Sequence, residues 1–104
     1  MLFEVELSEH AEEQYDAILF YLAYKLKNPQ AVSGVMEDFD TAIKLLERNA
    51  DVYGMCNSRK LRDLGFHKLH FEKHKYLMVY RIKEHRVIVE GIYHELQDYE
   101  NSIE

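Results

Sequence analysis

The chain has 104 residues, of which 47% are hydrophobic and 31% are charged, and its formal net charge is -6. This length fits one domain over residues 1–104, and the composition lacks the polar bias of disordered chains. Its apolar runs fall short of the roughly 20 residues that a membrane span needs. The one cysteine, Cys56, excludes a disulfide framework, so we expect a cytoplasmic protein without membrane association.

The charge is unevenly distributed along the chain. Residues 1–58 carry four Lys/Arg against eleven Asp/Glu, residues 59–86 carry nine against three, and residues 87–104 carry none against five. A basic segment in an acidic chain is typical of a surface that faces a polyanion. Outward lysines that protect strand edges from aggregation would give the same pattern.

The first half of the chain predicts a strand and two helices. Residues 3–7 alternate apolar and acidic side chains, as in a half-buried strand. Ser8 is a favourable N-cap, and apolar residues then recur every three or four positions to about Lys27. Asn28 and Pro29 end this helix and begin a second of similar length, because Asn caps a helix and Pro suits its first position. The two helices therefore form an antiparallel hairpin.

The second half predicts an irregular segment and three strands. Periodicity fails over residues 50–65, where a short helical turn is the only regular structure we expect. Aromatic and branched residues then mark strands at Phe66–Phe71, Tyr76–Ile82 and Val87–Tyr93. The predicted fold is α+β: an N-terminal strand, a helical hairpin and a three-stranded antiparallel meander that completes one small sheet.

A turn centred on Glu84 and His85 would place Ile82 opposite Val87 and fix the faces of the last hairpin. One face, nearly all apolar, should pack on the helices; it carries Tyr76, Met78, Tyr80 and Ile82 opposite Tyr93, Gly91, Val89 and Val87. The other face should be partly open; it carries Lys75, Leu77, Val79 and Arg81 opposite His94, Ile92, Glu90 and Ile88. For the strand that begins at Phe66, either alternate set of side chains can lie inward.

The open face holds the residue types that RNA cleavage requires. Arg81 can stabilise charge on a phosphate, and Glu90 or His94 can move the proton of a 2′-hydroxyl. Cations at the rim would bind the RNA backbone; the candidates are Lys68, His70, Lys73 and Lys75. Such chemistry needs no metal or cofactor. A surface ion pair between Arg81 and Glu90 is the plainer alternative.

Three histidines raise the question of a metal site. His67, His70 and His74 lie at spacings of three and four on a strand and the turn after it, which does not bring them to one point. We therefore expect no metal.

Several segments together resemble the RelE/ParE superfamily, the toxins of bacterial type II toxin-antitoxin modules, also known as plasmid stabilisation proteins. The resemblance rests on YLAYKLKNPQAV at the helix junction, on LRDLGFHKLHFEKHKYLMVYRI and VIVEGIYHE in the strands, and on the order of the elements. It covers nearly the whole chain. It implies a compact α+β toxin that a cognate antitoxin neutralises by wrapping across its surface.

The superfamily implies two activities. RelE-like members cut messenger RNA on the ribosome, and ParE-like members poison DNA gyrase. In the RelE-like pattern a strand arginine contacts the scissile phosphate, and that position holds Leu77 here, while Tyr93-His94 resembles the end of one RNA-cleaving branch. On sequence alone we favour a metal-independent, ribosome-dependent endoribonuclease, which predicts that Arg81, Glu90 and His94 converge on one groove. A gyrase poison and an inactive binding protein with an acidic tail are the alternatives.

Overall fold

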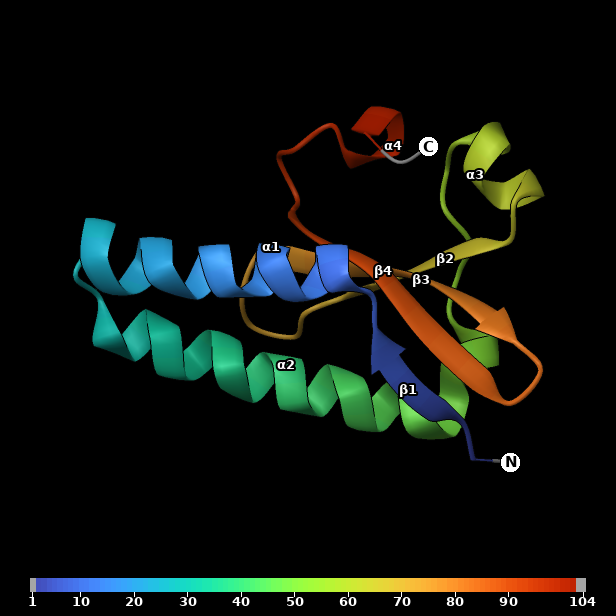
Figure 1. Ribbon diagram of the computed structural model, residues 1–104, viewed down its shortest axis with the longest axis horizontal. Coiled ribbons are helices and arrows are strands. Elements are labelled where there is room, and N and C mark those ends of the chain that lie inside the picture. Colours follow the sequence, from blue (N-terminus) through green and yellow to red (C-terminus); the bar gives the residue numbers. More distant parts are fainter. Residues whose placement is uncertain (1, 103–104) are drawn as a thin grey trace.

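The computed structural model describes residues 2–102 and has the α+β architecture that the sequence predicts (Figure 1). The elements are β1 (Glu4–Leu7), α1 (Glu9–Phe20), α2 (Pro29–Asn49), α3 (Arg59–Asp63), β2 (Phe66–His70), β3 (Tyr76–Lys83), β4 (Arg86–His94) and α4 (Tyr99–Ser102). One four-stranded sheet has the order β1-β4-β3-β2, in which β1 is parallel to β4 and the other pairs are antiparallel.

The helical hairpin forms for the predicted reasons. The Ser8 side chain accepts a hydrogen bond from the Ala11 amide at 3.0 Å, and Asn28 accepts one from Ala31 at 3.0 Å. α1 continues as a π-helical turn, Tyr21–Lys25, before the chain reverses. The paired helices extend beyond the end of the sheet, so the tip of the hairpin projects from the body of the protein (Figure 1). No helix within residues 2–102 has the length and apolar character to cross a membrane.

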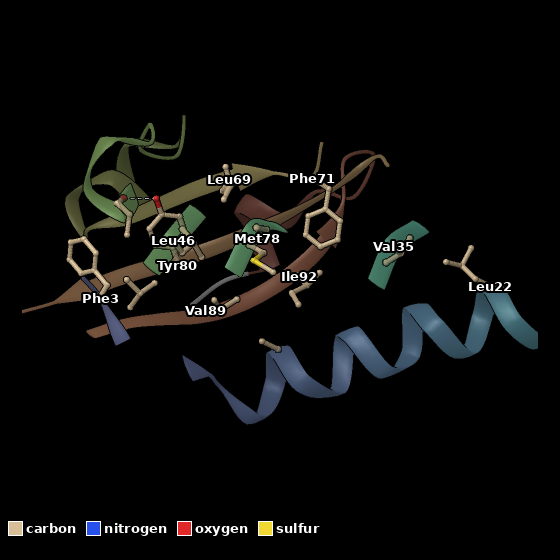
Figure 2. Close-up of a cluster of buried hydrophobic side chains, with 14 residues drawn as sticks. Phe3, Leu22, Val35, Leu46, Leu69, Phe71, Met78, Tyr80, Val89 and Ile92 are labelled. Atoms are coloured by element: carbon tan, nitrogen blue, oxygen red, sulfur yellow. Dashed lines mark hydrogen bonds between the residues drawn. The ribbon is translucent and has the colours of Figure 1, made fainter. Parts of the chain in front are cut away.

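The main core lies between the helical hairpin and one face of the sheet (Figure 2). β3 contributes the buried side chains of Met78 and Tyr80, as predicted, and the Tyr80 hydroxyl donates a 2.7 Å hydrogen bond to the Ala50 carbonyl. β2 directs Leu69 into this core. The stacking of His67 on Tyr80, with ring centroids 5.3 Å apart, places the imidazole on the same face.

The predicted register of the last hairpin is correct near the turn and wrong beyond it. Ile82 pairs with Val87 and Tyr80 with Val89, as expected. A bulge then leaves Glu90 without a partner in the pairing, so that Val79 pairs with Gly91, Leu77 with Tyr93 and Tyr76 with His94. One extra residue moves each later β4 side chain to the opposite face. Tyr93 therefore points away from the helices, contrary to the prediction.

The sheet face away from the helical hairpin is covered along its middle, which overturns the expectation of an open surface. Leu77 and Val79 are 1% and 0% exposed. They belong to a second core whose buried members are Cys56, Leu61, Phe66, Leu77, Val79 and Tyr93. The segment that contains α3 and the C-terminal segment cover this face, because Leu61 packs into it and Tyr99 lies against it. Leu77 is thus a structural residue.

The two covering segments are joined to each other. The amide of Ser58, the N-cap of α3, donates a 3.0 Å hydrogen bond to a carboxylate oxygen of Glu100 in α4. Burial raises the pKa of the Cys56 thiol; Glu100 raises it further, and Lys68 opposes the shift. The thiol is therefore protonated and inert, as expected for a buried cysteine.

Candidate functional site

Arg81 is held on the covered face of the sheet by a carboxylate and an aromatic ring. Its Nε donates a 2.9 Å hydrogen bond to Oε2 of Glu90, and Nη2 donates to the same oxygen. The guanidinium carbon lies 5.0 Å from the centroid of the Phe66 ring, within cation–π range. Glu90, which the bulge leaves out of the regular pairing, lies on the same face as Arg81. Predicted site residues Arg81 and Glu90 thus lie together, as an ion pair.

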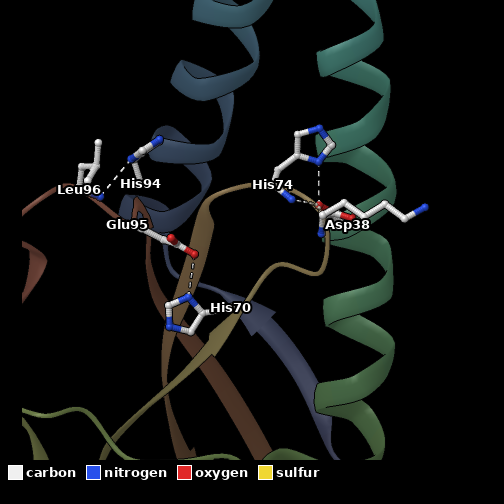
Figure 3. Close-up of polar contacts among 7 residues, drawn as sticks. Asp38, His70, His74, His94, Glu95 and Leu96 are labelled. Carbon is white, nitrogen blue, oxygen red and sulfur yellow. Dashed lines mark hydrogen bonds and ion pairs between the residues drawn. The ribbon is translucent and has the colours of Figure 1, made fainter.

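His94 is at the other end of β4 and on the other face. The His94 and Tyr76 rings form a T-shaped pair with centroids 5.2 Å apart, and Tyr76 packs against the main core. The Leu96 amide donates to His94 Nδ1 at 3.0 Å (Figure 3). Since Nδ1 is an acceptor, the proton of the neutral ring is on Nε2.

The predicted groove of Arg81, Glu90 and His94 does not form. Arg81 lies over Phe66 in the second core, whereas His94 lies against Tyr76 on the side of the main core. The sheet separates them, and a strand rises about 3.3 Å per residue, so the five residues from Arg81 back to Tyr76, the partner of His94, add further separation along it. The extra residue at Glu90 causes this separation, because it turns each later side chain of β4 to the opposite face of the sheet.

The rim residues are distributed over several settings. Lys68 is half-buried near Cys56, while Lys73 and Lys75 are exposed in the turn between β2 and β3. His70 Nδ1 lies 3.1 Å from a carboxylate oxygen of Glu95, and the two side chains are 49% and 38% exposed (Figure 3). The Glu95 amide donates to the Lys75 carbonyl at 2.9 Å, which places these three residues at one end of the sheet.

A buried carboxylate that the sequence reading missed anchors the turn between β2 and β3. Asp38 of α2 is 4% exposed and accepts hydrogen bonds from the amides of Lys73 and His74 at 3.1 and 2.9 Å and from His74 Nδ1 at 2.8 Å (Figure 3). Gly34, one turn earlier, leaves space for the imidazole, since a Cβ there would lie 2.4 Å from His74 Cε1. The available signal was an acid within the apolar stripe of the second helix.

The three histidines considered for a metal site have three different partners. His67 Nδ1 lies 3.0 Å from the Tyr53 carbonyl, His70 faces Glu95, and His74 faces Asp38. Within residues 2–102, no three potential ligand side chains gather at one point.

The projecting tip of the helical hairpin carries exposed aromatic rings. Phe20 and Tyr24 are 65% and 68% exposed, and their ring centroids are 4.7 Å apart. Tyr21 and Leu26 are also exposed beside them. Exposed aromatic residues in contact at a projecting tip are typical of surfaces that bind a protein, a membrane or a ligand.

Comparisons with known proteins agree with the fold. A family model described as "ParE toxin of type II toxin-antitoxin system, parDE" matches residues 5–99. A chain of the chromosomal ParDE toxin-antitoxin system from P. aeruginosa is 16% identical with a TM-score of 0.68, and the match covers 89% of this chain and 96% of that one. No curated protein sequence matches the chain.

Two further solved structures have the same fold at low identity. The YoeB dimer from Staphylococcus aureus has a TM-score of 0.59 at 15% identity, covering 90% of this chain and 98% of that one. A chain of the E. coli DinJ-YafQ toxin-antitoxin complex has a TM-score of 0.55 at 16% identity, and the match covers 90% of this chain and 93% of that one. The fold is that of type II toxins in the RelE/ParE superfamily. The chain belongs to the ParE toxin family.

Proposed function

We propose that this toxin arrests growth by binding a protein target rather than by cutting RNA, and that the target is DNA gyrase, as the ParE-like resemblance implies. The observation that carries the proposal is the separation of Arg81 and His94 onto opposite faces of the sheet. Acid–base cleavage requires both groups within hydrogen-bond reach of one phosphodiester. The sequence alone favoured the nuclease, and this geometry reverses that order.

Two other features support a protein target. Leu77, at the position where the RelE-like pattern has its phosphate-binding arginine, is buried in the second core. The exposed aromatic tip of the hairpin offers a surface suited to protein contact. Binding to gyrase needs no catalytic constellation.

A cognate antitoxin is the second partner in this proposal. The P. aeruginosa ParDE system and the E. coli DinJ-YafQ structure are toxin-antitoxin systems. Family membership supports the same arrangement here, with an antitoxin that covers the toxin surface.

The proposal is tested with purified toxin and purified gyrase. We expect inhibition of supercoiling and accumulation of cleaved plasmid in the presence of toxin, and expression of the toxin alone should arrest growth and induce the DNA-damage response. Growth arrest with unimpaired gyrase would refute the proposed target. Normal growth at verified expression would instead show an inactive member that only binds antitoxin.

An RNA-cleaving toxin is the second candidate, and one observation favours it. The exposed imidazole of His70 is oriented by the Glu95 carboxylate, and Lys75 adjoins this pair at the same end of the sheet. An imidazole and carboxylate in contact can act as a general base. If ribosome-dependent cleavage of messenger RNA occurs and is lost in His70→Ala, this pair performs the chemistry.

A further inference from the structure

A small pocket lies on the covered side of the sheet, beyond the end of α3. Its lining combines apolar side chains with two cations and consists of Leu64, Gly65, Arg81, Ile82, Lys83 and Ile88. Its volume is about 210 Å³. Pockets for complete small molecules measure about 300–1,000 Å³, so this one has room for one or two amino-acid side chains.

Arg81 is fixed in this pocket before any ligand arrives. Glu90 engages Nε and Nη2 through a single oxygen, and the Phe66 ring supports the guanidinium plane. A guanidinium has five N–H donors, so Nη1 and the second Nη2 proton can serve a ligand. The side chain is 46% exposed, which leaves this edge accessible. A prepositioned donor edge loses little entropy on binding.

The charge and lining of the pocket define its ligand. Arg81 and Lys83 carry two positive charges and Glu90 one negative charge, which leaves a single excess positive charge. Leu64 and Ile88 offer an apolar wall beside it, since Ile88 pairs with Arg81 and shares its face. We propose that this pocket binds a peptide segment in which a carboxylate adjoins an aliphatic side chain, with the carboxylate on the free edge of Arg81 and the aliphatic group on that wall.

This chemistry favours a carboxylate over an RNA phosphate. The two oxygens of a carboxylate match the free donor edge of the guanidinium, and its one negative charge matches the one excess positive charge of the pocket. Phosphodiester chains are bound by successive cations along the strand, whereas an apolar wall occupies that space here. The inference does not depend on whether gyrase is the target of the toxin.

The test uses the whole chain, labelled with ¹⁵N, and four dipeptide probes. Acetyl-leucyl-glutamate amide should shift the NMR signals of Arg81 Nε–H and the Gly65 amide. Acetyl-leucyl-glutamine amide and acetyl-glycyl-glutamate amide should each bind at least about tenfold more weakly, since each lacks one of the two features. Acetyl-glutaminyl-leucine, whose only carboxylate is at the chain end, distinguishes capture of a chain end from capture of a side chain.

Variants make the assignment specific. Arg81→Gln should abolish the shifts at Gly65, and Arg81→Lys should weaken binding, because a lysine lacks the planar fork. Arg86→Gln is the matched control: Arg86 is equally exposed at 46% and paired with Glu6, but does not line the pocket. Thermal unfolding verifies that each variant is folded.

Three results would overturn the inference. Equal binding of the glutamine and glutamate probes would show that the carboxylate is not recognised. Binding that survives Arg81→Gln in a folded variant would place the site elsewhere. Inorganic phosphate or a short RNA that produces the same shifts at lower concentration than the leucyl-glutamate probe would make the pocket a phosphate site.

Discussion

Arg81 and His94 lie on opposite faces of the sheet, one over the Phe66 ring and the other against the Tyr76 ring. This relationship follows from one extra residue, Glu90, between Val89 and Gly91 in the pairing of β4 with β3. It decides which chemistry the fold can support, because one substrate cannot touch both side chains through the sheet.

His94→Ala should retain full growth arrest when the toxin is expressed alone. The His94 ring is engaged by Tyr76 and the Leu96 amide and shares no site with Arg81. Growth after induction measures this, with expression verified by immunoblot. Loss of arrest in a folded His94→Ala protein would restore His94 as a catalytic group.

Leu77→Arg should destabilise the protein and create no nuclease. Leu77 is 1% exposed in the second core, so even Leu77→Ala should cost about 2–5 kcal/mol of unfolding free energy. An arginine there adds the cost of burying a charge. Urea denaturation measures both variants. A stable Leu77→Arg protein that cleaves RNA would contradict the structural role of this residue.

Gly34→Ala should lower the unfolding free energy by about 1–3 kcal/mol, since the added methyl group overlaps His74. Gly54→Ala is the control, because nothing lies within 4 Å of a Cβ at that position. The penalty should shrink in Gly34→Ala combined with His74→Ala, where the obstruction is gone. If urea denaturation shows that the double variant loses as much unfolding free energy as the two single variants together, the imidazole does not occupy this space.

Stability should fall between pH 10 and 12 partly through Tyr15. Burial raises the pKa of Tyr15 from 10.0 to about 12, and the nearby Asp40 and Asp16 add to the shift. The folded state therefore favours the protonated phenol, and this contribution is complete below pH 10 and lost as the pH approaches 12.

Tyr15→Phe tests this assignment. From pH 10 to 12 the stability of this variant should fall less steeply than that of the wild type. Its ring should stay stacked on Phe39, whose centroid is 4.2 Å away. Tyr24→Phe, at an exposed position, should keep the wild-type slope. Urea midpoints measured from pH 9 to 12 give the comparison, and identical slopes for wild type and Tyr15→Phe would contradict it.

Local signals predicted the elements of this fold well. Ser8 and Asn28 cap their helices with the expected hydrogen bonds, and the turn at Glu84 and His85 sets the expected pairs of Ile82 and Tyr80. These features depend on neighbouring residues, which a single sequence displays directly.

The candidate site was harder to predict because long-range contacts shape it. The bulge at Glu90 has no local signal stronger than the adjacent Gly91, and it inverted the predicted faces. The burial of Leu77 depends on covering segments far away in sequence, joined through Ser58 and Glu100. The anchoring of the β2–β3 turn depends likewise on Asp38, 36 residues before His74. No periodicity encodes such contacts.

The central claim, that this toxin does not cut RNA, is tested most directly by primer extension across a translated messenger after induction of the toxin alone. We predict growth arrest with intact messenger, identical to the pattern before induction. Codon-phased cuts that appear with the arrest, and that disappear in His70→Ala or His94→Ala, would contradict the claim.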